Sequence, residues 1–171
     1  MRKRLYLFIF TGLFAALAAA LTFVHLPIPM LNGGYVHLGD SLVYLAACML
    51  PAPYAALAAG IGGGLADLLS GAPAWAPFTV LIKVGMTLFF SSRRGKLLDV
   101  RQILGLLPAA LLNAGGYYLA EGLMYGSWKA ILWPSLTGNL IQSAGSTAVF
   151  LALCLALDRA KGKQRLEVYY R

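Results

Sequence analysis

The chain alternates long apolar runs with short breaks rich in proline, glycine or basic residues, and this pattern predicts a bundle of six helices. A helix that crosses a bilayer needs about 20 mostly apolar residues, so a chain of this length has room for six crossings and short loops. We expect a single all-α membrane domain over residues 1–171, with helices at about 5–24, 38–50, 54–69, 76–91, 103–124 and 132–157.

The composition points to lipid as the surrounding solvent. Hydrophobic residues make up 60% of the chain and charged residues 12%, whereas a soluble domain carries about 25% charged residues. The net charge of +8 does not indicate a nucleic-acid partner, because the basic residues form short segments between apolar runs. The basic start also resembles a signal peptide, but the run over residues 5–24 is longer than a signal sequence, which favours a retained first helix.

The basic residues predict the orientation in the membrane. With six crossings, 12 of the 14 lysines and arginines fall on the side of the termini, and the opposite loops hold only Lys129. Because cytoplasmic segments carry an excess of Lys and Arg, we expect both termini in the cytoplasm. The three tryptophans fall near the predicted outer ends of helices, where an aromatic belt is expected.

The second helix is predicted to be short, and the segment before it, residues 25–37, contains two prolines and two glycines. A helix of this length cannot cross a hydrocarbon core of about 30 Å. Non-helical backbone at membrane depth is tolerated where protein buries it or where it lines a cavity. Residues 25–37 are therefore a candidate wall or lid of a binding site.

Small residues recur every four positions on two helices, and this spacing predicts close contact between helices. The first helix carries two such registers, and two readings stay open for both: packing within the chain, or docking of a partner subunit. Gly60 and Gly64 of the third helix indicate packing, as do Cys48 and Cys154, which lie inside apolar runs. The residues of the two registers are Gly12, Ala16 and Ala20, and Ala15 and Ala19.

Four ionisable residues lie within the predicted spans, and by the predicted orientation all belong to the outer half: Asp40, Asp67, Lys83 and Glu121. A charge inside a membrane is costly, so such residues usually pair or line a functional cavity. Their convergence predicts a polar pocket open to the outside. The alternatives are that Asp40 caps the second helix and that Lys83 forms a structural ion pair with Asp67 or Asp40.

Further polar and aromatic residues extend this predicted pocket. Asn113 and Tyr117 share a helix face with Glu121, and Asn139 and Gln142 lie three apart on the last helix. Amide side chains both donate and accept, which suits a heterocyclic ligand, although hydrogen bonding between helices is the alternative. Trp75 and Tyr35 are candidates for stacking on a ring, with anchoring at the membrane interface as the alternative for Trp75.

No motif for hydrolysis, nucleotide binding or a cofactor stands out in the sequence. His25 and His37 bracket one loop, but two histidines without a carboxylate cluster make a weak case for a metal. We therefore expect no metal and no cofactor, and we expect the two histidines to be exposed loop residues.

Four segments together resemble the substrate-binding S component of energy-coupling factor (ECF) vitamin transporters. They occur in the family's order and cover nearly the whole chain. They are Gly-Tyr-Val-His-Leu-Gly-Asp at 34–40, the stretch from Gly-Gly-Gly at 62–64 to Lys83, Gly-Tyr-Tyr-Leu-Ala-Glu at 116–121, and Gly-Asn-Leu-Ile-Gln at 138–142.

The resemblance implies a multi-pass protein of the bacterial cell membrane with an outward pocket that includes His37 and is closed by the loop after the first helix. It implies docking of the alanine-rich face of that helix on a transmembrane coupling subunit, with two cytoplasmic ATPases as further partners. The protein itself would then not be an enzyme. The implied substrates are of the hydroxymethylpyrimidine, pyridoxine, riboflavin or queuosine and queuine types.

Three other functions compete with this interpretation. A stand-alone secondary transporter usually shows an internal repeat, and none is visible here. A small membrane enzyme acting on lipids should carry acid–base residues near the cytoplasmic interface, where this sequence is mainly basic. A structural assembly factor would need no polar residues such as Asp40 and Lys83 within its spans.

Overall fold

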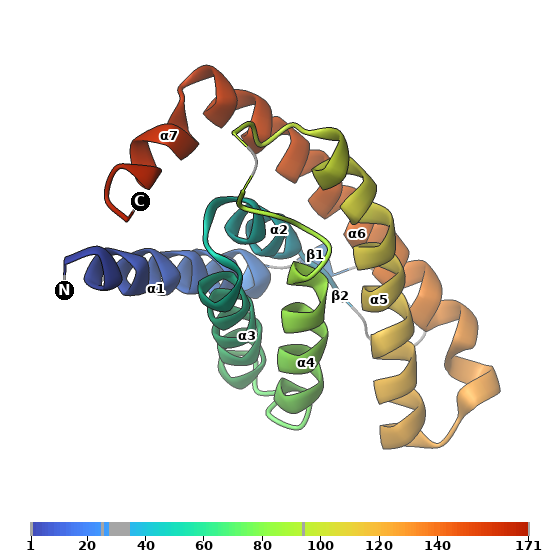
Figure 1. Ribbon diagram of the computed structural model, residues 1–171. Coiled ribbons are helices and arrows are strands. Elements are labelled where there is room, and N and C mark those ends of the chain that lie inside the picture. Colours follow the sequence, from blue (N-terminus) through green and yellow to red (C-terminus); the bar gives the residue numbers. More distant parts are fainter. Residues whose placement is uncertain (1, 25, 28–34, 94, 171) are drawn as a thin grey trace.

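The computed structural model describes residues 2–24, 26–27, 35–93 and 95–170, with side chains for all of these except 26–27 and 35–36. The described part is a helical bundle, as predicted (Figure 1). Its helices are α1 (Arg2–Phe23), α2 (Asp40–Met49), α3 (Ala52–Leu69), α4 (Ala76–Thr87), α5 (Val100–Tyr125), α6 (Trp128–Arg159) and α7 (Gly162–Glu167).

Four of these helices, α1, α3, α5 and α6, are long and apolar enough to cross a membrane, which confirms a multi-pass architecture. The helices α2 and α4 are apolar but contain only 10 and 12 residues. The number of six crossings stays a prediction. The boundaries that differ most from expectation are the end of α4, at Thr87, and the start of α6, at Trp128.

The short helix α2 lies in the middle of the bundle, and all ten of its residues are buried. Its Tyr44 ring stacks on Phe90 with centroids 5.1 Å apart and meets the edge of Phe150 at 5.7 Å. An apolar helix with no exposed face needs no lipid contact, which explains why α2 can be short. Cys48 and Cys154 are also fully buried, which confirms that they pack inside the bundle.

Two short strands precede α2, an addition to the predicted all-α fold. The strand β1 (Leu26–Pro27) pairs antiparallel with β2 (Tyr35–Val36), with Leu26 opposite Val36. The pair brings the two sides of the predicted wall or lid segment together beside the start of α2. Residues 25 and 28–34 of that segment lie outside the described residues.

The glycines of α3 let it pack closely against two neighbours, which confirms the packing interpretation. A Cβ atom added to Gly60 or Gly64 would meet side chains of α4 at 3.1 Å and 3.0 Å. One added to Gly62 would lie 2.9 Å from the carbonyl oxygen of Ala15 and 3.0 Å from the Cβ of Ala18, both on α1. Backbone atoms cannot move aside as a flexible side chain can, so the α1–α3 contact depends on Gly62.

We therefore expect Gly62→Ala to lower the free energy of unfolding by about 1–3 kcal/mol, the usual cost of overpacking. Gly115→Ala on α5 is the matched control, because a Cβ there meets nothing within 4 Å. It should leave stability unchanged or raise it by up to about 1 kcal/mol through helix propensity. Unfolding of both variants in mixed micelles measures the difference, and equal stabilities would contradict the close contact.

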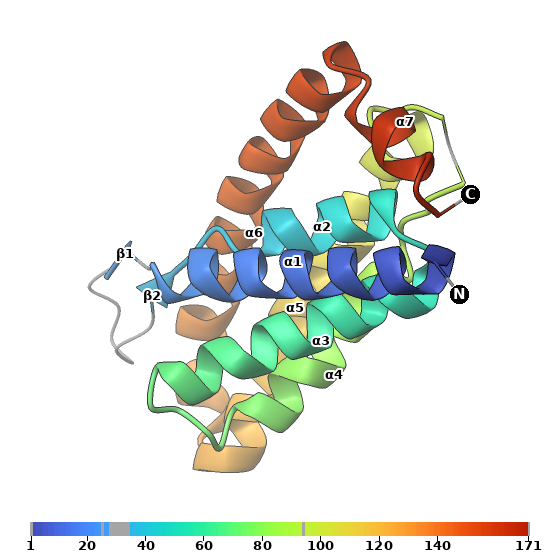
Figure 2. The same ribbon diagram turned by 90° about the vertical axis from the view of Figure 1, so that its left-hand side faces the viewer.

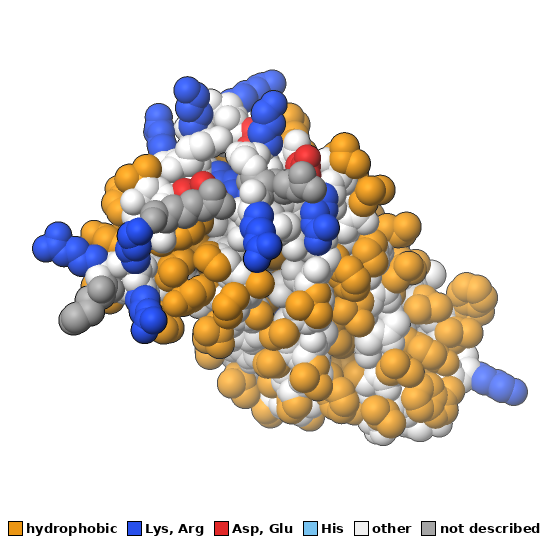
Figure 3. Space-filling model, viewed as in Figure 1, with side chains coloured by type: hydrophobic (Ala, Val, Ile, Leu, Met, Phe, Trp, Pro, Cys, Tyr) orange, Lys and Arg blue, Asp and Glu red, His pale blue; other side chains and the backbone are white. Residues whose placement is uncertain are grey.

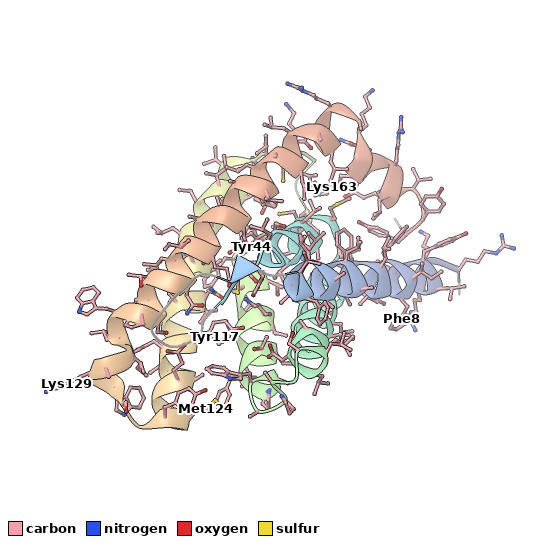
Figure 4. The ribbon with its side chains drawn as sticks, turned by 180° about the vertical axis from the view of Figure 1, so that it is seen from behind. Phe8, Tyr44, Tyr117, Met124, Lys129 and Lys163 are labelled. Carbon is pink, nitrogen blue, oxygen red and sulfur yellow. The ribbon has the colours of Figure 1, made fainter. Side chains whose placement is uncertain are left out.

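The two termini lie near each other at one end of the molecule, in both ribbon views (Figures 1 and 2). Lysine and arginine side chains gather at this end, around the start of α1 and around α7 (Figure 3). The α3–α4 and α5–α6 turns lie at the other end, where Lys129 projects (Figure 4). The bundle thus has one strongly basic end and one end with little charge.

Candidate substrate-binding site

A cavity of about 630 Å³ lies in the half of the bundle away from the termini. Its walls come mainly from the α3–α4 turn and from the facing ends of α5 and α6. This volume is within the range of about 300–1,000 Å³ typical of small-molecule sites. The lining residues are Thr22, His37, Gly63, Asp67, Ala72, Trp75, Thr79, Lys83, Tyr117, Glu121, Tyr125, Ser127, Ile131, Pro134, Ser135, Gly138, Asn139 and Gln142.

Lys83 of α4 lies at the base of this cavity and joins three helices. Its Nζ is 2.6 Å from Oδ1 of Asp40 on α2 and donates a hydrogen bond of 2.9 Å to Oδ1 of Asn113 on α5. The side chains of Lys83 and Asp40 are only 3% and 1% exposed. A buried charge is tolerated when it is paired and hydrogen-bonded, and this pair meets both conditions.

Asp40 uses its carboxylate for contacts between helices rather than for capping. Its second oxygen accepts a hydrogen bond of 3.0 Å from the Gln142 amide on α6. The cap position of α2 is Gly39, and no side-chain capping bond forms there. The predicted capping role is therefore wrong, and Asp40 was the correct one of the two acids proposed to pair with Lys83.

The amide of Asn113 continues the network toward α6. Its Nδ2 lies 3.4 Å from Oδ1 of Asn139 and 3.4 Å from Oγ of Ser143. Asn139 in turn donates a hydrogen bond of 2.9 Å to the carbonyl oxygen of Ser135. Asn139 and Gln142 thus form the hydrogen bonds between helices that the sequence offered as the alternative. Both also line the cavity, and their contact with a ligand stays a prediction.

Aromatic rings form one side of the cavity. The Tyr117 ring projects from α5 into the bundle interior (Figure 4), and its centroid lies 6.2 Å from that of Trp75 and 5.2 Å from Nζ of Lys83. Trp75 is also 6.2 Å from the Tyr125 ring. The Tyr117 hydroxyl is held at 3.0 Å from Oγ1 of Thr79. Rings fixed in this way offer a flat surface for an aromatic ligand.

Comparison with known proteins identifies the family of this chain. The model of the family described as ECF-type riboflavin transporter, S component, matches residues 4–159. The chain belongs to this family. It is 31% identical to the thiamine precursor transporter HmpT of Lactococcus lactis subsp. cremoris (strain MG1363) over 142 residues, which cover 82% of this chain and 80% of that protein. It is also 32% identical over 110 residues to an uncharacterized protein of Pyrococcus woesei, covering 63% of this chain and 72% of that protein.

As an S component, the protein is the membrane-embedded substrate-binding subunit of a vitamin-type transporter. The family implies a coupling subunit and ATPases as partners and a small molecule as substrate. This S component is a transport subunit and not an enzyme, because ATP hydrolysis resides in the partner subunits. Membership in this family therefore excludes the competing functions of a lipid enzyme and a structural assembly factor.

The structure brings most of the predicted site residues of this S component together. Those that line the cavity are His37, Asp67, Trp75, Lys83, Tyr117, Glu121, Asn139 and Gln142. Asp40 and Asn113 lie directly behind the cavity wall, bonded to Lys83. Tyr35 belongs to β2, but its side chain lies outside the described residues.

Several lining residues were not predicted, although helical spacing offered a signal for three of them. Thr79 precedes Lys83 by four residues, Ser135 precedes Asn139 by four, and Tyr125 follows Glu121 by four. Residues four apart share a helix face, so extending each predicted face by one turn would have found them. Thr22, at the end of α1, carried no comparable signal.

The expectation that both histidines are exposed is wrong for His37. This side chain is only 6% exposed, and its Nδ1 accepts a hydrogen bond of 3.2 Å from the backbone N–H of Gly39. His25 lies outside the described residues. Among the described residues, no group of three or more His, Cys, Asp or Glu side chains is placed to hold a metal ion.

The two small-residue registers of α1 have different surroundings in this S component. Ala15 and Ala19 are 2% and 5% exposed and face the bundle interior. Gly12, Ala16 and Ala20 are exposed, and a Cβ atom on Gly12 would meet nothing within 4 Å. Packing within the chain therefore accounts for the first pair, and the exposed register remains available for a partner.

Proposed function

We propose that this S component captures a flat, vitamin-like heterocycle from outside the cell in the 630 Å³ cavity. The observation that carries the proposal is the combination of a fixed aromatic wall, Trp75 and Tyr117, with the polar network around Lys83. Rings of this kind stack on a planar ligand, and a few convergent polar groups fix its orientation.

The substrate belongs to the group of small vitamins and their precursors. The family's description names riboflavin, and the name of the Lactococcus relative specifies a thiamine precursor. Among the substrates implied by the sequence resemblance, these two findings support the riboflavin and hydroxymethylpyrimidine types. The comparisons give no support for the pyridoxine or the queuosine type.

The orientation we propose places both termini in the cytoplasm and the cavity in the outer half of a single six-crossing domain over residues 1–171. The basic end of the molecule, which holds both termini, supports this orientation because cytoplasmic segments are rich in Lys and Arg (Figure 3). The segments that contain the short helices α2 and α4, extended by non-helical residues beside them, would complete six crossings together with the four longer helices.

The exposed register of α1 is the proposed docking face for the coupling subunit. Small side chains allow close approach of another helix, and Gly12, Ala16 and Ala20 present such a stripe on the outside of the bundle. The large residues beside it, including Leu13 and Leu17, are 51% and 46% exposed. The partners beyond this contact are the two cytoplasmic ATPases.

We expect Ala16→Trp to weaken docking at least about tenfold while leaving ligand binding unchanged, because the indole ring prevents close helix approach. Leu81→Trp, on the exposed face of α4 where Leu81 is 72% exposed, is the matched control for a large ring on the lipid-facing surface. Co-purification of the tagged coupling subunit with each variant measures docking. If both variants recovered equal amounts of the coupling subunit, the stripe would not be the docking face.

Native mass spectrometry of the protein purified in mild detergent tests the proposed function directly. Cells grown in rich medium supply the vitamins, and a co-purifying small molecule identifies the substrate class. We expect a bound mass within the range of a vitamin or its precursor. A protein that stays empty after incubation with flavins, pyrimidines and pyridoxine would overturn the assignment of the cavity.

A further inference from the structure

Three polar atoms in the cavity wall have no hydrogen-bond partner among the described residues: Oδ2 of Asp67, Oε2 of Glu121 and Oγ of Ser135. They come from three different helices, α3, α5 and α6, and all three residues line the same cavity. Asp67 is 6% exposed and Ser135 is 2% exposed. The Ser135 hydroxyl lies near the Glu121 carboxyl group, and the Thr79 hydroxyl lies near that of Asp67. Because buried polar groups in proteins nearly always have a partner, the two carboxyl oxygens that remain, Oδ2 of Asp67 and Oε2 of Glu121, indicate where a ligand's donors belong.

The basic group in the cavity is already engaged. Lys83 is the only lysine or arginine among the lining residues, and it is neutralised by Asp40 and bonded to Asn113. The second oxygen of Asp40 is occupied by Gln142, and the hydroxyls of Thr79 and Tyr117 are bonded to each other. The network behind the cavity is therefore largely satisfied without a ligand.

The charges of the cavity wall consequently do not balance. Lys83 and His37 are the basic side chains among the described lining residues, and the carboxyl groups of Asp40, Asp67 and Glu121 at the cavity outnumber them. An unpaired charge in a low-dielectric site is costly. An anionic ligand would add to this cost, whereas a ligand with N–H donors or a positive charge would reduce it.

We propose that the ligand is an unphosphorylated planar nitrogen heterocycle with an exocyclic amino group or a protonated ring nitrogen. Its N–H groups donate to Asp67 and Glu121, while its ring lies against Trp75 and Tyr117. The inference rests on the proposed function and narrows its substrate class. It favours aminopyrimidine-like ligands over flavins, and it excludes phosphate esters from the site.

The first test compares matched probes on the unaltered protein by isothermal titration calorimetry in detergent. The probes are 4-amino-5-hydroxymethyl-2-methylpyrimidine, the same molecule with a methyl group in place of the amino group, the phosphate ester of the amino compound, and riboflavin. We expect the amino compound to bind at least about tenfold more tightly than each of the others, because hydrogen bonds to charged groups are strong.

The second test removes each carboxylate without changing its shape. Asp67→Asn and Glu121→Gln should each weaken binding of the amino compound about tenfold or more and leave binding of the methyl compound within about twofold. Asp99→Asn, just before α5 at the opposite end of the bundle, is the control and should change neither affinity.

The outcomes separate this inference from the proposed function. Tight binding of riboflavin together with equal or weaker binding of the amino compound would overturn the inference and leave the vitamin-binding function standing. Unchanged affinity in both carboxylate variants would also overturn the inference alone. A protein that binds none of the probes would overturn both.

Discussion

Replacing Lys83 with methionine is expected to lower the free energy of unfolding by about 3–5 kcal/mol, the usual cost of breaking a buried ion pair from one side. The substitution keeps most of the side-chain volume but leaves Asp40 charged, 1% exposed and without its ion-pair partner, although the neutral amide of Gln142 still donates to it. It also removes the donor to Asn113. Ligand affinity should fall at least about a hundredfold, since Lys83 both lines the cavity and positions its neighbours.

The double variant Asp40→Asn with Lys83→Met separates the two effects. It removes both charges together and keeps an oxygen that accepts from Gln142, so most of the lost stability should return. Ligand binding should stay weak, because the polar base of the cavity is still missing. Unfolding in mixed micelles and calorimetric titration measure the two quantities. A single variant as stable as the unaltered protein would show that the pair is not a structural requirement.

Much of the candidate site could be predicted because the relevant residues lie on helices with clear periodicity. Asn113, Tyr117 and Glu121 follow one another at intervals of four, and the structure places all three at or directly behind the cavity wall. Polar side chains within apolar spans are costly in lipid, so they must face the interior. Spacing and polarity together thus fixed the helix face without any knowledge of the tertiary structure.

The choice between pairing partners could not be predicted in the same way. Asp40 and Asp67 are both acids near the cavity, and the sequence left either one as the partner of Lys83. The packing of α2 against α4 brings Asp40 within ion-pair distance of Lys83. The sequence alone does not specify how these helices pack. The consequence is large, because the acid left over, Asp67, becomes a candidate ligand-binding group.

The sequence alone also could not predict which alanines of α1 face the interior of the bundle. Both registers have identical spacing, so periodicity alone cannot tell which one faces the chain's own helices. The glycines of α3 distinguish the two registers, because Gly62 has no side chain and therefore lets Ala15 and Ala18 of α1 pack closely against it. Only the remaining register is left for a partner.

The helix α7 was also missed, for a different physical reason. It has only six residues, lies in a basic segment and is too short to be stable from its own propensity. Aromatic contacts after it hold this end of the chain: the Tyr169 ring lies 5.1 Å from Tyr6, and the Tyr170 ring lies 6.4 Å from Phe10. Both contacts join the last residues to α1, which no local pattern predicts.

Replacing Tyr170 with alanine is expected to lower the free energy of unfolding by about 3 kcal/mol or more, as for other buried aromatic residues. The side chain is 9% exposed, its ring packs against Phe10, and its hydroxyl donates a hydrogen bond to the carbonyl oxygen of Met49 at the end of α2. The variant therefore loosens the contact of the last segment with both α1 and α2.

Tyr170→Phe keeps the ring and removes only the hydroxyl, so it should cost about 1 kcal/mol. Neither variant should change ligand affinity by more than about twofold, because Tyr170 contacts Phe10 of α1 and Met49 of α2, and none of these three residues lines the cavity. Unfolding in mixed micelles and calorimetric titration give both quantities. A loss of affinity in Tyr170→Ala that matches its loss of stability would instead show that α2 transmits changes between the two ends, since its first residue is Asp40 and its last residue is Met49. The pair of variants thus tests whether the two ends of this S component are energetically independent.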